Sequence, residues 1–277
     1  MRLFLFLILL NLCFFSCKKY DAALTAFYLK PSKASVTSNL SQGSNSSKIT
    51  DLWVYTNGQF QGAYPYNHLI PIVNNNKSAK IQIFAGIKNN GIADTRVFWL
   101  FYSPLEFDTL IESGKTIEMP LVFEYNSNTK FVINENFDNV GNVFNNSSIS
   151  DTIYNITSSE ESLEGKFLKL ELKGQSIIGQ IETSQTYSLP AGSENVYLEL
   201  NYKCNKEFSI GLIGDKDPQL KEAITLSAKE NWNKIYIQLS NAVSLAPVSN
   251  KYKLYFRMIN NNDNSKLYID NLKLIYL

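Results

Sequence analysis

ITDLWVYTNGQFQGAY, residues 49–64, predicts a β-hairpin. Residues 49–56 are β-branched and aromatic, and residues 59–64 alternate polar with apolar side chains, as half-buried strands do. Asn57 and Gly58 stand between them and form the strongest short signal for a two-residue turn. A type I′ turn needs positive φ at both central residues, which glycine adopts without steric cost. This part of the chain is therefore expected to be antiparallel β-structure.

Strand patterns continue along the rest of the chain, and no sustained 3.6-residue apolar period appears. A polar stretch at residues 126–130 separates a first block from a second one. About eight strand patterns in the roughly 145 residues of the second block fit a two-sheet sandwich or jelly roll. A helical turn is expected only at residues 217–223. The strands expected after the hairpin are residues 79–84, 95–102, 118–125, 131–137, 166–172, 177–182, 195–202, 208–213, 232–239, 251–258 and 266–276.

The composition agrees with a folded chain of modest charge. The 277 residues are 44% hydrophobic and 18% charged, and at about 150 residues per domain this length predicts two domains. The 26 Lys+Arg are balanced by 25 Asp+Glu, whereas a nucleic-acid-binding protein needs an excess of positive charge. One histidine and three cysteines leave little for a zinc cluster, a His-dependent triad or a disulfide framework. We therefore predict an all-β chain of two β-sandwich domains, the second a jelly roll.

The first residues match the pattern of a secretory signal. Arg2 precedes the apolar run 3–10, which is too short to span a bilayer. The sequence Phe14-Phe15-Ser16-Cys17 resembles the lipobox of Bacteroidetes-type outer-membrane and surface lipoproteins. The resemblance implies that residues 1–16 are a signal peptide and that Cys17 carries a diacylglycerol and an acylated amino group, with palmitate as a typical acyl chain. The alternative is an ordinary signal peptide that contains a cysteine.

More than one acyl chain anchors a protein stably, and no later stretch approaches transmembrane length. The lipoprotein resemblance therefore implies an outer-membrane location through the N-terminal lipid. The residues Lys18-Lys19-Tyr20-Asp21 partly resemble the short charged surface-export signals of such lipoproteins. Display at the cell surface and attachment at the periplasmic face both stay open.

The mature chain divides into three parts. Residues 17–48 are expected to hold the lipidated N-terminus, a first strand and a flexible Ser/Asn-rich tether, with residues 31–48 as a long loop. Residues 49–128 resemble small immunoglobulin-like or transthyretin-like domains of surface lipoproteins. The positions that carry this resemblance are Trp53, Val54, Tyr55, Gly58, Gly62, Gly86 and Ile87.

Residues 129–277 carry a second resemblance. The segments 134–138 (Asn-Glu-Asn-Phe-Asp), 197–202 (Tyr-Leu-Glu-Leu-Asn-Tyr) and 268–271 (Tyr-Ile-Asp-Asn) look like the frame of carbohydrate-binding-module and galactose-binding-like jelly rolls. In those domains the first and last strands lie close together. The resemblance implies a glycan ligand for this part of the chain.

Aromatic side chains in the second block are candidates for a sugar-binding platform, because sugars stack their C–H faces on flat rings. Alternation along a strand offers another interpretation, in which half of these rings face inward and fill the core. Tyr252 and Phe256 share one parity and Tyr255 has the other, and for Trp232 a core position is preferred. The candidate ligand-binding residues are Trp232, Tyr236, Tyr252, Tyr255 and Tyr268.

No cofactor is expected apart from a structural calcium ion, which takes six to eight oxygen ligands. In the carbohydrate-binding jelly rolls that the second block resembles, calcium often ties the first strand to the last, and this implies Glu135, Asp138 and Asp270 as ligands. Asp215 and Asp217 are a second candidate pair. The alternative, which is preferred at both places, is a polar strand end or a solvated turn.

Other reactive residues give no recognisable site. His68 is the only histidine, and a loop residue with a local hydrogen bond is the preferred interpretation. Residues 174–179 miss the G-x-S-x-G pattern by one residue. Cys204 is expected to be a small buried hydrophobic residue. Asp108-Thr109-Leu110 and Asp151-Thr152-Ile153 resemble the O-glycosylation sequon of exported Bacteroidetes-type proteins, which makes Thr109 and Thr152 glycosylation candidates.

The sequence favours a non-catalytic envelope lipoprotein that binds a glycan or another extracellular ligand through the jelly roll. A structural, assembly or adhesion role, with contacts to envelope proteins, is the alternative, which an exposed apolar patch or an open sheet edge would favour. A glycan-active enzyme comes third, because it needs two carboxylates that face one cleft, and no motif pairs them.

Overall fold

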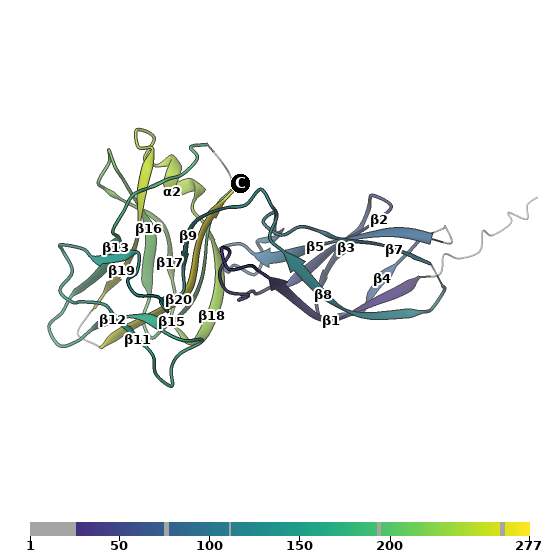
Figure 1. Ribbon diagram of the computed structural model, residues 1–277, viewed down its shortest axis with the longest axis horizontal. Helices are drawn as coiled ribbons and strands as arrows, with labels where there is room; N and C mark the ends of the chain where they lie inside the picture. The colour runs from purple at the N-terminus through teal and green to yellow at the C-terminus, as the bar shows by residue number, and fades with distance from the viewer. Residues whose placement is uncertain (1–25, 75–77, 111, 193–194, 261–263) are drawn as a thin grey trace, which may run out of the picture.

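The computed structural model describes residues 26–74, 78–110, 112–192, 195–260 and 264–277. Within these residues the regular secondary structure is almost entirely β-strand and forms two β-sandwiches that lie end to end (Figure 1). The prediction of an all-β fold is confirmed. Cys17 and the expected signal peptide lie outside the described residues. No helix in the described part of the chain is long and apolar enough to cross a membrane.

The first sandwich packs two sheets against each other. Its described strands are β1 (Phe27–Thr37), β2 (Asp51–Thr56), β3 (Gln59–Pro65), β4 (Ile70–Ile72), β5 (Ser78–Lys88), β6 (Arg96–Phe98), β7 (Leu105–Leu110) and β8 (Thr116–Glu124). β1 is the middle strand of the sheet β4-β1-β8, antiparallel to β4 and parallel to β8. The other sheet has the order β3-β2-β5-β6, and β7 also pairs with β5. Alternate side chains of these strands, such as Leu29, Leu52, Ile81 and Phe123, fill the core between the sheets.

β2 and β3 form the hairpin that the sequence predicts. Asn57 and Gly58 have φ angles of 51° and 78°, and Thr56 pairs with Gln59 on the other side of the turn. Both central residues therefore have the positive φ that a type I′ turn requires.

The prediction that residues 31–48 form a loop was wrong for residues 31–37. These residues belong to β1, which stays paired with β8 to its last residue. Because β1 is the middle strand of its sheet, the first sandwich begins there and not at residue 49. The second half of β1 carries exposed serine and lysine side chains and a register shift between Pro31 and Lys33, so its sequence lacks the alternation by which a strand is predicted.

Residues 38–48, expected to be a flexible tether, lie against the second sandwich. The Ser46 hydroxyl donates a hydrogen bond to Asn201 Oδ1 at 2.6 Å, and the Lys48 backbone N–H donates to the Tyr236 hydroxyl oxygen at 2.9 Å. The polar side chains of this segment are therefore used for contacts between the two sandwiches.

The second sandwich consists of two six-stranded sheets. Its described elements are β9 (Lys130–Glu135), β10 (Phe144–Asn146), β11 (Asn155–Thr157), β12 (Phe167–Leu172), β13 (Ile178–Thr183), β14 (Tyr187–Ser188), β15 (Val196–Cys204), β16 (Phe208–Gly214), β17 (Leu220–Leu226), β18 (Lys229–Gln238), α2 (Ser240–Ser244), β19 (Lys251–Ile259) and β20 (Ser265–Tyr276). One sheet has the order β10-β13-β19-β16-β17, with β14 on β19, and the other has the order β11-β12-β20-β15-β18, with β9 on β20. The first strand β9 and the last strand β20 are thus neighbours, as the jelly-roll resemblance implied.

The helical turn expected at residues 217–223 was wrong. This region leads into β17, which pairs with β16 along the edge of its sheet. The backbone groups of β16 are available for a partner, and this pairing overrides the local sequence preference. The short helix α2 follows β18 instead.

Aromatic packing joins the two sandwiches. Tyr197, Tyr236 and Ile275 come from the second sandwich but belong to the hydrophobic cluster of the first. The ring of Trp99, in the first sandwich, lies 4.8 Å from the ring of Tyr197 and 4.7 Å from that of Tyr236. The junction is therefore a continuation of the core of the first sandwich.

Charged residues are also buried at this junction. Glu199 is fully buried, accepts hydrogen bonds from the Tyr125 hydroxyl at 2.9 and 3.1 Å, and forms an ion pair with Lys234 at 3.3 Å. Lys273 donates a hydrogen bond to the Tyr125 hydroxyl at 3.0 Å. Glu199, Lys234 and Lys273 come from β15, β18 and β20, and Tyr125 follows β8. This network fixes the position of one sandwich against the other.

Candidate ligand-binding site

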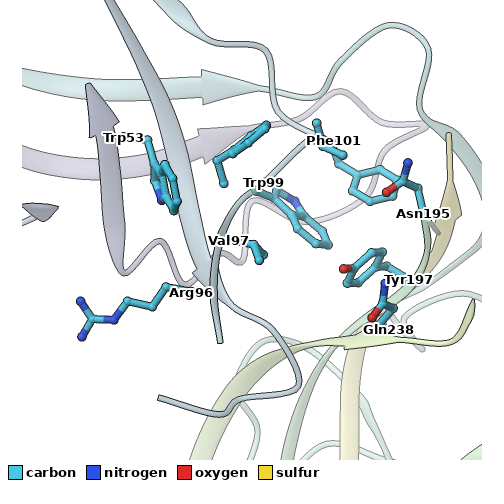
Figure 2. Close-up of a pocket in the computed structure, with 10 residues that line it drawn as sticks. Trp53, Arg96, Val97, Trp99, Phe101, Asn195, Tyr197 and Gln238 are labelled. Carbon is cyan, nitrogen blue, oxygen red and sulfur yellow. The ribbon is translucent and has the colours of Figure 1, made fainter. Parts of the chain in front are cut away.

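A pocket of about 310 Å³ lies at the junction of the two sandwiches (Figure 2). Aromatic residues from the first sandwich form one side of it, and the beginning of β15 and the end of β18 form the other. Figure 2 shows Trp99 between these two sides. The residues that line the pocket are Trp53, Arg96, Val97, Phe98, Trp99, Leu100, Phe101, Asn195, Tyr197 and Gln238.

The aromatic side of the pocket depends on close contacts within the first sandwich. Trp99 is 2% exposed and lies 4.7 Å from Phe101, measured between ring centroids. Trp53 projects from the outer face of β2, opposite the core. It lies close over Gly86 of β5, where an added Cβ would come within 3.0 Å of the indole nitrogen. A residue without a side chain at this position therefore lets the indole lie against the sheet.

The other side of the pocket carries polar side chains. Asn195, Tyr197 and Gln238 come from the second sandwich, and Tyr197 and Gln238 are neighbours across the β15–β18 pair. The end of β18 is held to the first sandwich by a hydrogen bond from the Gln238 N–H to Asn90 Oδ1 at 2.9 Å. The Gln238 side-chain oxygen accepts a hydrogen bond from the Asn89 amide at 3.4 Å. Two side-chain amides therefore lie opposite aromatic rings.

The electrostatic character of the pocket is mild. Its lining residues include no carboxylate. Arg96 forms an ion pair with Asp51 at 2.9 Å, and Figure 2 shows its guanidinium directed away from Trp99. The indole N–H groups of Trp53 and Trp99 are buried and have no acceptor among the described residues. Protein atoms cover both nitrogens, so they are not exposed to the pocket as donors.

The five aromatic residues singled out in the second block do not lie together on one face, and the alternative of core positions accounts for Tyr252. Tyr252 is 1% exposed in the core, and its hydroxyl donates to the Ser249 carbonyl at 2.9 Å. Tyr236 lies in the junction, where the first sandwich covers the sheet face from which it projects. Tyr255 lies outside the core cluster on the other face of β19, where burial raises the pKa of its hydroxyl to about 12. The sequence indicates which face of a strand a residue occupies, but not what covers that face.

Trp232 and Tyr268 are the two candidates that the fold brings together. They form a cluster with Phe167, with ring centroids 5.2–6.3 Å apart. Glu161 closes this cluster, because its backbone carbonyl accepts from the Trp232 indole at 2.7 Å and its carboxylate accepts from the Tyr268 hydroxyl at 3.0 Å. Tyr268 is only 2% exposed, so its ring offers no open face to a sugar.

The calcium ligands that the resemblance implies stay a prediction. Both carboxylate oxygens of Glu135 accept backbone N–H groups, at 2.8 and 3.1 Å. Asp138 accepts from the Lys166 N–H at 2.8 Å, and one Asp270 oxygen accepts from the Asn271 N–H at 2.7 Å. No group of three or more His, Cys, Asp or Glu in the described ranges could hold a metal ion. Glu135 and Asp138 thus fix turns by accepting backbone N–H groups, whereas Asp270 Oδ2 is buried and has no hydrogen-bond partner among the described residues.

The second acidic pair has similar local roles. Asp215 accepts from the Asn250 and Lys251 N–H groups at 3.2 and 3.4 Å. Asp217 forms an ion pair with Lys221 at 2.8 Å. The alternative interpretation of a turn accounts for both residues.

His68 and Cys204 occupy the places that the sequence predicts. His68 is exposed and lies 2.8 Å from Asn67 Oδ1, measured from Nδ1. Cys204 is 2% exposed, and burial raises the pKa of its thiol above the usual range. Neither residue lies beside a catalytic partner in the described part of the chain.

The two glycosylation candidates stay predictions. Thr109 lies on β7 and is partly buried. Thr152 is also partly buried, and its hydroxyl donates to the Glu171 carbonyl at 2.8 Å. A sugar on Thr152 would replace this hydrogen bond between a loop and β12.

Sequence analysis missed the pocket at the junction. Its residues lie on segments that are far apart in the chain, and no local motif joins them. One signal was available, because Trp53 and Tyr55 alternate with the core residues Leu52 and Val54. Apolar side chains on both faces of a strand indicate that the outer face has a use other than contact with water.

The solved structures similar to this chain include carbohydrate-binding modules. A family 61 module in complex with β-1,4-galactotriose is 13% identical, with a TM-score of 0.33, and the match covers 48% of this chain and 87% of the module. A family 29 module variant complexed with mannohexaose is 12% identical over 53% of this chain and 90% of the module, with a TM-score of 0.37. No protein-family model matches the chain, and a search of curated proteins finds no match. The similarity concerns the fold, and no ligand is carried over from it.

Proposed function

We propose that this protein is a non-catalytic glycan-binding protein whose binding site is the pocket at the junction. The observation that carries the proposal is the pairing of two partly exposed rings from the first sandwich, Trp53 and Phe98, with two side-chain amides from the second. A sugar ring has C–H faces that pack on aromatic rings and hydroxyl groups that hydrogen-bond with amides. At about 310 Å³, the pocket has the size of the smaller ligand sites of proteins.

The sequence predicted a ligand site in the second sandwich alone, whereas the proposed site lies at the junction of both sandwiches. Four of the aromatic residues first considered in the second sandwich are buried, whereas Trp53, like Trp232, is only partly buried. Gln238 and Asn195 supply the polar groups from the second sandwich. Both sandwiches would therefore be needed to bind the ligand.

A glycan array followed by calorimetry on the full chain tests this proposal. Trp53→Ala should remove a stacking surface and Gln238→Ala a hydrogen-bonding group, and each should weaken glycan binding by roughly tenfold. Gln219→Ala, an exposed amide on the same sandwich as Gln238, is the control and should bind normally. Thermal unfolding of each variant shows that it is folded. An array without any bound glycan would contradict the proposal, as would normal binding by both pocket variants.

We also propose that the protein is held in the outer membrane by lipid on Cys17. The support is the sequence Phe14-Phe15-Ser16-Cys17 after a short apolar run. In cells fed labelled palmitate, the wild-type chain should take up label and fractionate with the outer membrane, and Cys17→Ala should do neither. An unlabelled wild-type chain that keeps residues 1–16 would refute the anchor.

A further inference from the structure

Aromatic side chains also gather on the outer face of the first sandwich. Trp53 and Tyr55 project from β2, Phe60 from β3, Phe84 from β5 and Phe98 from β6. We call these five residues the aromatic patch. None of them belongs to the core cluster, and Phe60 and Phe98 are 51% and 38% exposed. The sheet therefore presents aromatic rings to solvent on the face opposite its core.

The rings of the aromatic patch form one continuous surface. Neighbouring ring centroids are 5.1 Å apart for Tyr55 and Phe60, 5.5 Å for Tyr55 and Phe84, and 5.6 Å for Phe84 and Phe98. Trp53 closes the circle, at 5.6 Å from Phe60 and 5.8 Å from Phe98. Because neighbouring strands lie about 4.8 Å apart, the patch spans roughly 14 Å from β3 to β6.

The aromatic patch is continuous with the pocket at the junction. Trp53 and Phe98 belong to both, since they also line the pocket. A ligand chain that leaves the pocket across these two rings would next meet Phe84, Tyr55 and Phe60. The surface beside the pocket thus prolongs it in one direction, across the strands of the sheet.

Polar groups border the patch on β5 and β7. Gln82 pairs with Tyr55 across the strands, and its amide donates to Glu106 at 2.7 Å. Lys80 forms an ion pair with Glu106 at 2.6 Å. The patch itself contains rings and no aliphatic side chain. Flat rings with a polar border suit the C–H faces and hydroxyl groups of a sugar chain.

We propose that the aromatic patch extends the pocket into a binding surface for a glycan chain, so that the ligand is an oligosaccharide or polysaccharide and not a single sugar. This inference rests on the proposed function, since it prolongs the same site. It adds a requirement on length: one end of the chain lies in the pocket, and the following sugars lie on Phe84, Tyr55 and Phe60.

Calorimetry on the full chain with glycans of increasing length tests the inference. The probes are a monosaccharide, a disaccharide, a tetrasaccharide and a hexasaccharide of the class bound on the array, beginning with β-1,4-linked mannose, glucose and galactose. Affinity should rise with length. Phe60→Ala, which removes a patch ring that does not line the pocket, should weaken hexasaccharide binding by roughly three- to tenfold and leave disaccharide binding unchanged. Tyr66→Ala, an exposed aromatic residue outside the patch, is the matched control.

The outcomes separate this inference from the proposed function. If a monosaccharide binds as tightly as the hexasaccharide and Phe60→Ala binds both normally, the glycan site stands and the extended surface is refuted. If no glycan binds, the proposed function fails as well. If Phe60→Ala binds the hexasaccharide normally but loses an envelope protein that the wild type retains, the patch is a protein contact and the inference is overturned. Unchanged thermal unfolding of Phe60→Ala excludes misfolding as the cause.

Discussion

Lys273 extends from β20 into the junction, where its side chain is fully buried. Its amino group donates hydrogen bonds to the Ser44 carbonyl at 2.7 Å and to the Tyr125 hydroxyl at 3.0 Å. Burial lowers the pKa of this lysine to about 8, with a smaller contribution from the positive charge of Lys234, although Glu199 acts in the opposite direction. The folded chain therefore gives up this proton more readily than the unfolded chain does.

This shift predicts how stability changes with pH. Between pH 8 and about 10 the unfolded chain holds more protons at Lys273 than the folded chain, so the free energy of unfolding should rise with pH. The rise from this group should be roughly 1–3 kcal/mol across the window, and Lys273→Met should lack it. Urea unfolding of the wild type and the variant at both ends of the window measures the difference. Equal slopes in the two proteins would show that Lys273 does not titrate in this way.

The carboxylates of Glu135 and Asp138 give a second prediction at this scale. Because their oxygens accept backbone N–H groups, no metal ion is needed to satisfy them. We expect EDTA to leave the thermal unfolding midpoint unchanged and added calcium to leave it unchanged as well. A midpoint that falls with EDTA and recovers with calcium, but not with magnesium, would restore the calcium site implied by the resemblance.

For single residues, the alternation along a strand predicts correctly which face of the strand a side chain occupies. Tyr252 and Phe256 lie in the core and Tyr255 lies on the opposite face, as the alternation along β19 predicts. Tyr236 shows where this reasoning ends. It lies on the outer face of its sheet, and only the presence of the other sandwich makes that face buried.

The β2–β3 hairpin depends on the backbone conformation of Gly58 in its turn. An added Cβ at Gly58 would meet no atom within 4 Å, so a substitution there changes the backbone preference and no packing contact. Gly58 has a φ of 78°, which residues with a Cβ rarely adopt.

Gly58→Ala should therefore lower the free energy of unfolding by about 1 kcal/mol. Chemical denaturation measures this change, with the exposed neighbour Gln59→Ala as the control that should change little. A loss of several kcal/mol would indicate a packing role for Gly58 that its open surroundings do not show.

The sequence predicts the presence of a strand more reliably than it predicts the length of that strand. The strand expected at residues 95–102 is shortened to β6, because Trp99, Phe101 and Tyr102 leave the sheet and pack in the junction. The strand β17 replaces an expected helical turn, since β16 offers it an edge. Both differences arise from partners that are distant in the chain, which local patterns do not contain.

Across the whole molecule, the junction determines whether the sandwiches behave as separate units. Aromatic packing around Trp99 and the buried ion pair of Glu199 and Lys234 both cross or border it. Removing one partner of a buried ion pair leaves the other charge buried without compensation, which costs about 3–5 kcal/mol.

Scanning calorimetry should therefore show one cooperative transition for the wild type. Glu199→Gln should lower its midpoint by an amount equivalent to about 3–5 kcal/mol. Glu118→Gln removes an exposed ion pair with Lys30 and should change stability by less than about 1 kcal/mol. Two separate wild-type transitions, or a Glu199 variant as stable as the Glu118 control, would contradict the view of one unit.

The class of fold could be predicted from the sequence, whereas the site could not. Asn-Gly at a turn and alternation along strands can be recognised from neighbouring residues, and they occur throughout β-proteins. They therefore predict the fold class. The pocket combines Trp53 with Gln238, and the relative placement of two sandwiches brings them together. The only sequence signal for that region was that β2 has apolar side chains on both faces. This signal indicates that the outer face of the strand makes contacts, but it does not identify what the face contacts.

The direction of β1 determines how far the junction lies from the N-terminal end of the first sandwich. This strand enters the first sandwich at the end away from the second sandwich and leaves it at the junction (Figure 1). Its 11 residues extend over about 36 Å. Because β8 runs beside it and stiffens it, the first sandwich would act as a rigid stem for a chain fastened at Cys17. If Cys17 carries the proposed lipid, the pocket lies at the end of the stem away from that anchor, where a long polymer outside the bilayer could pass.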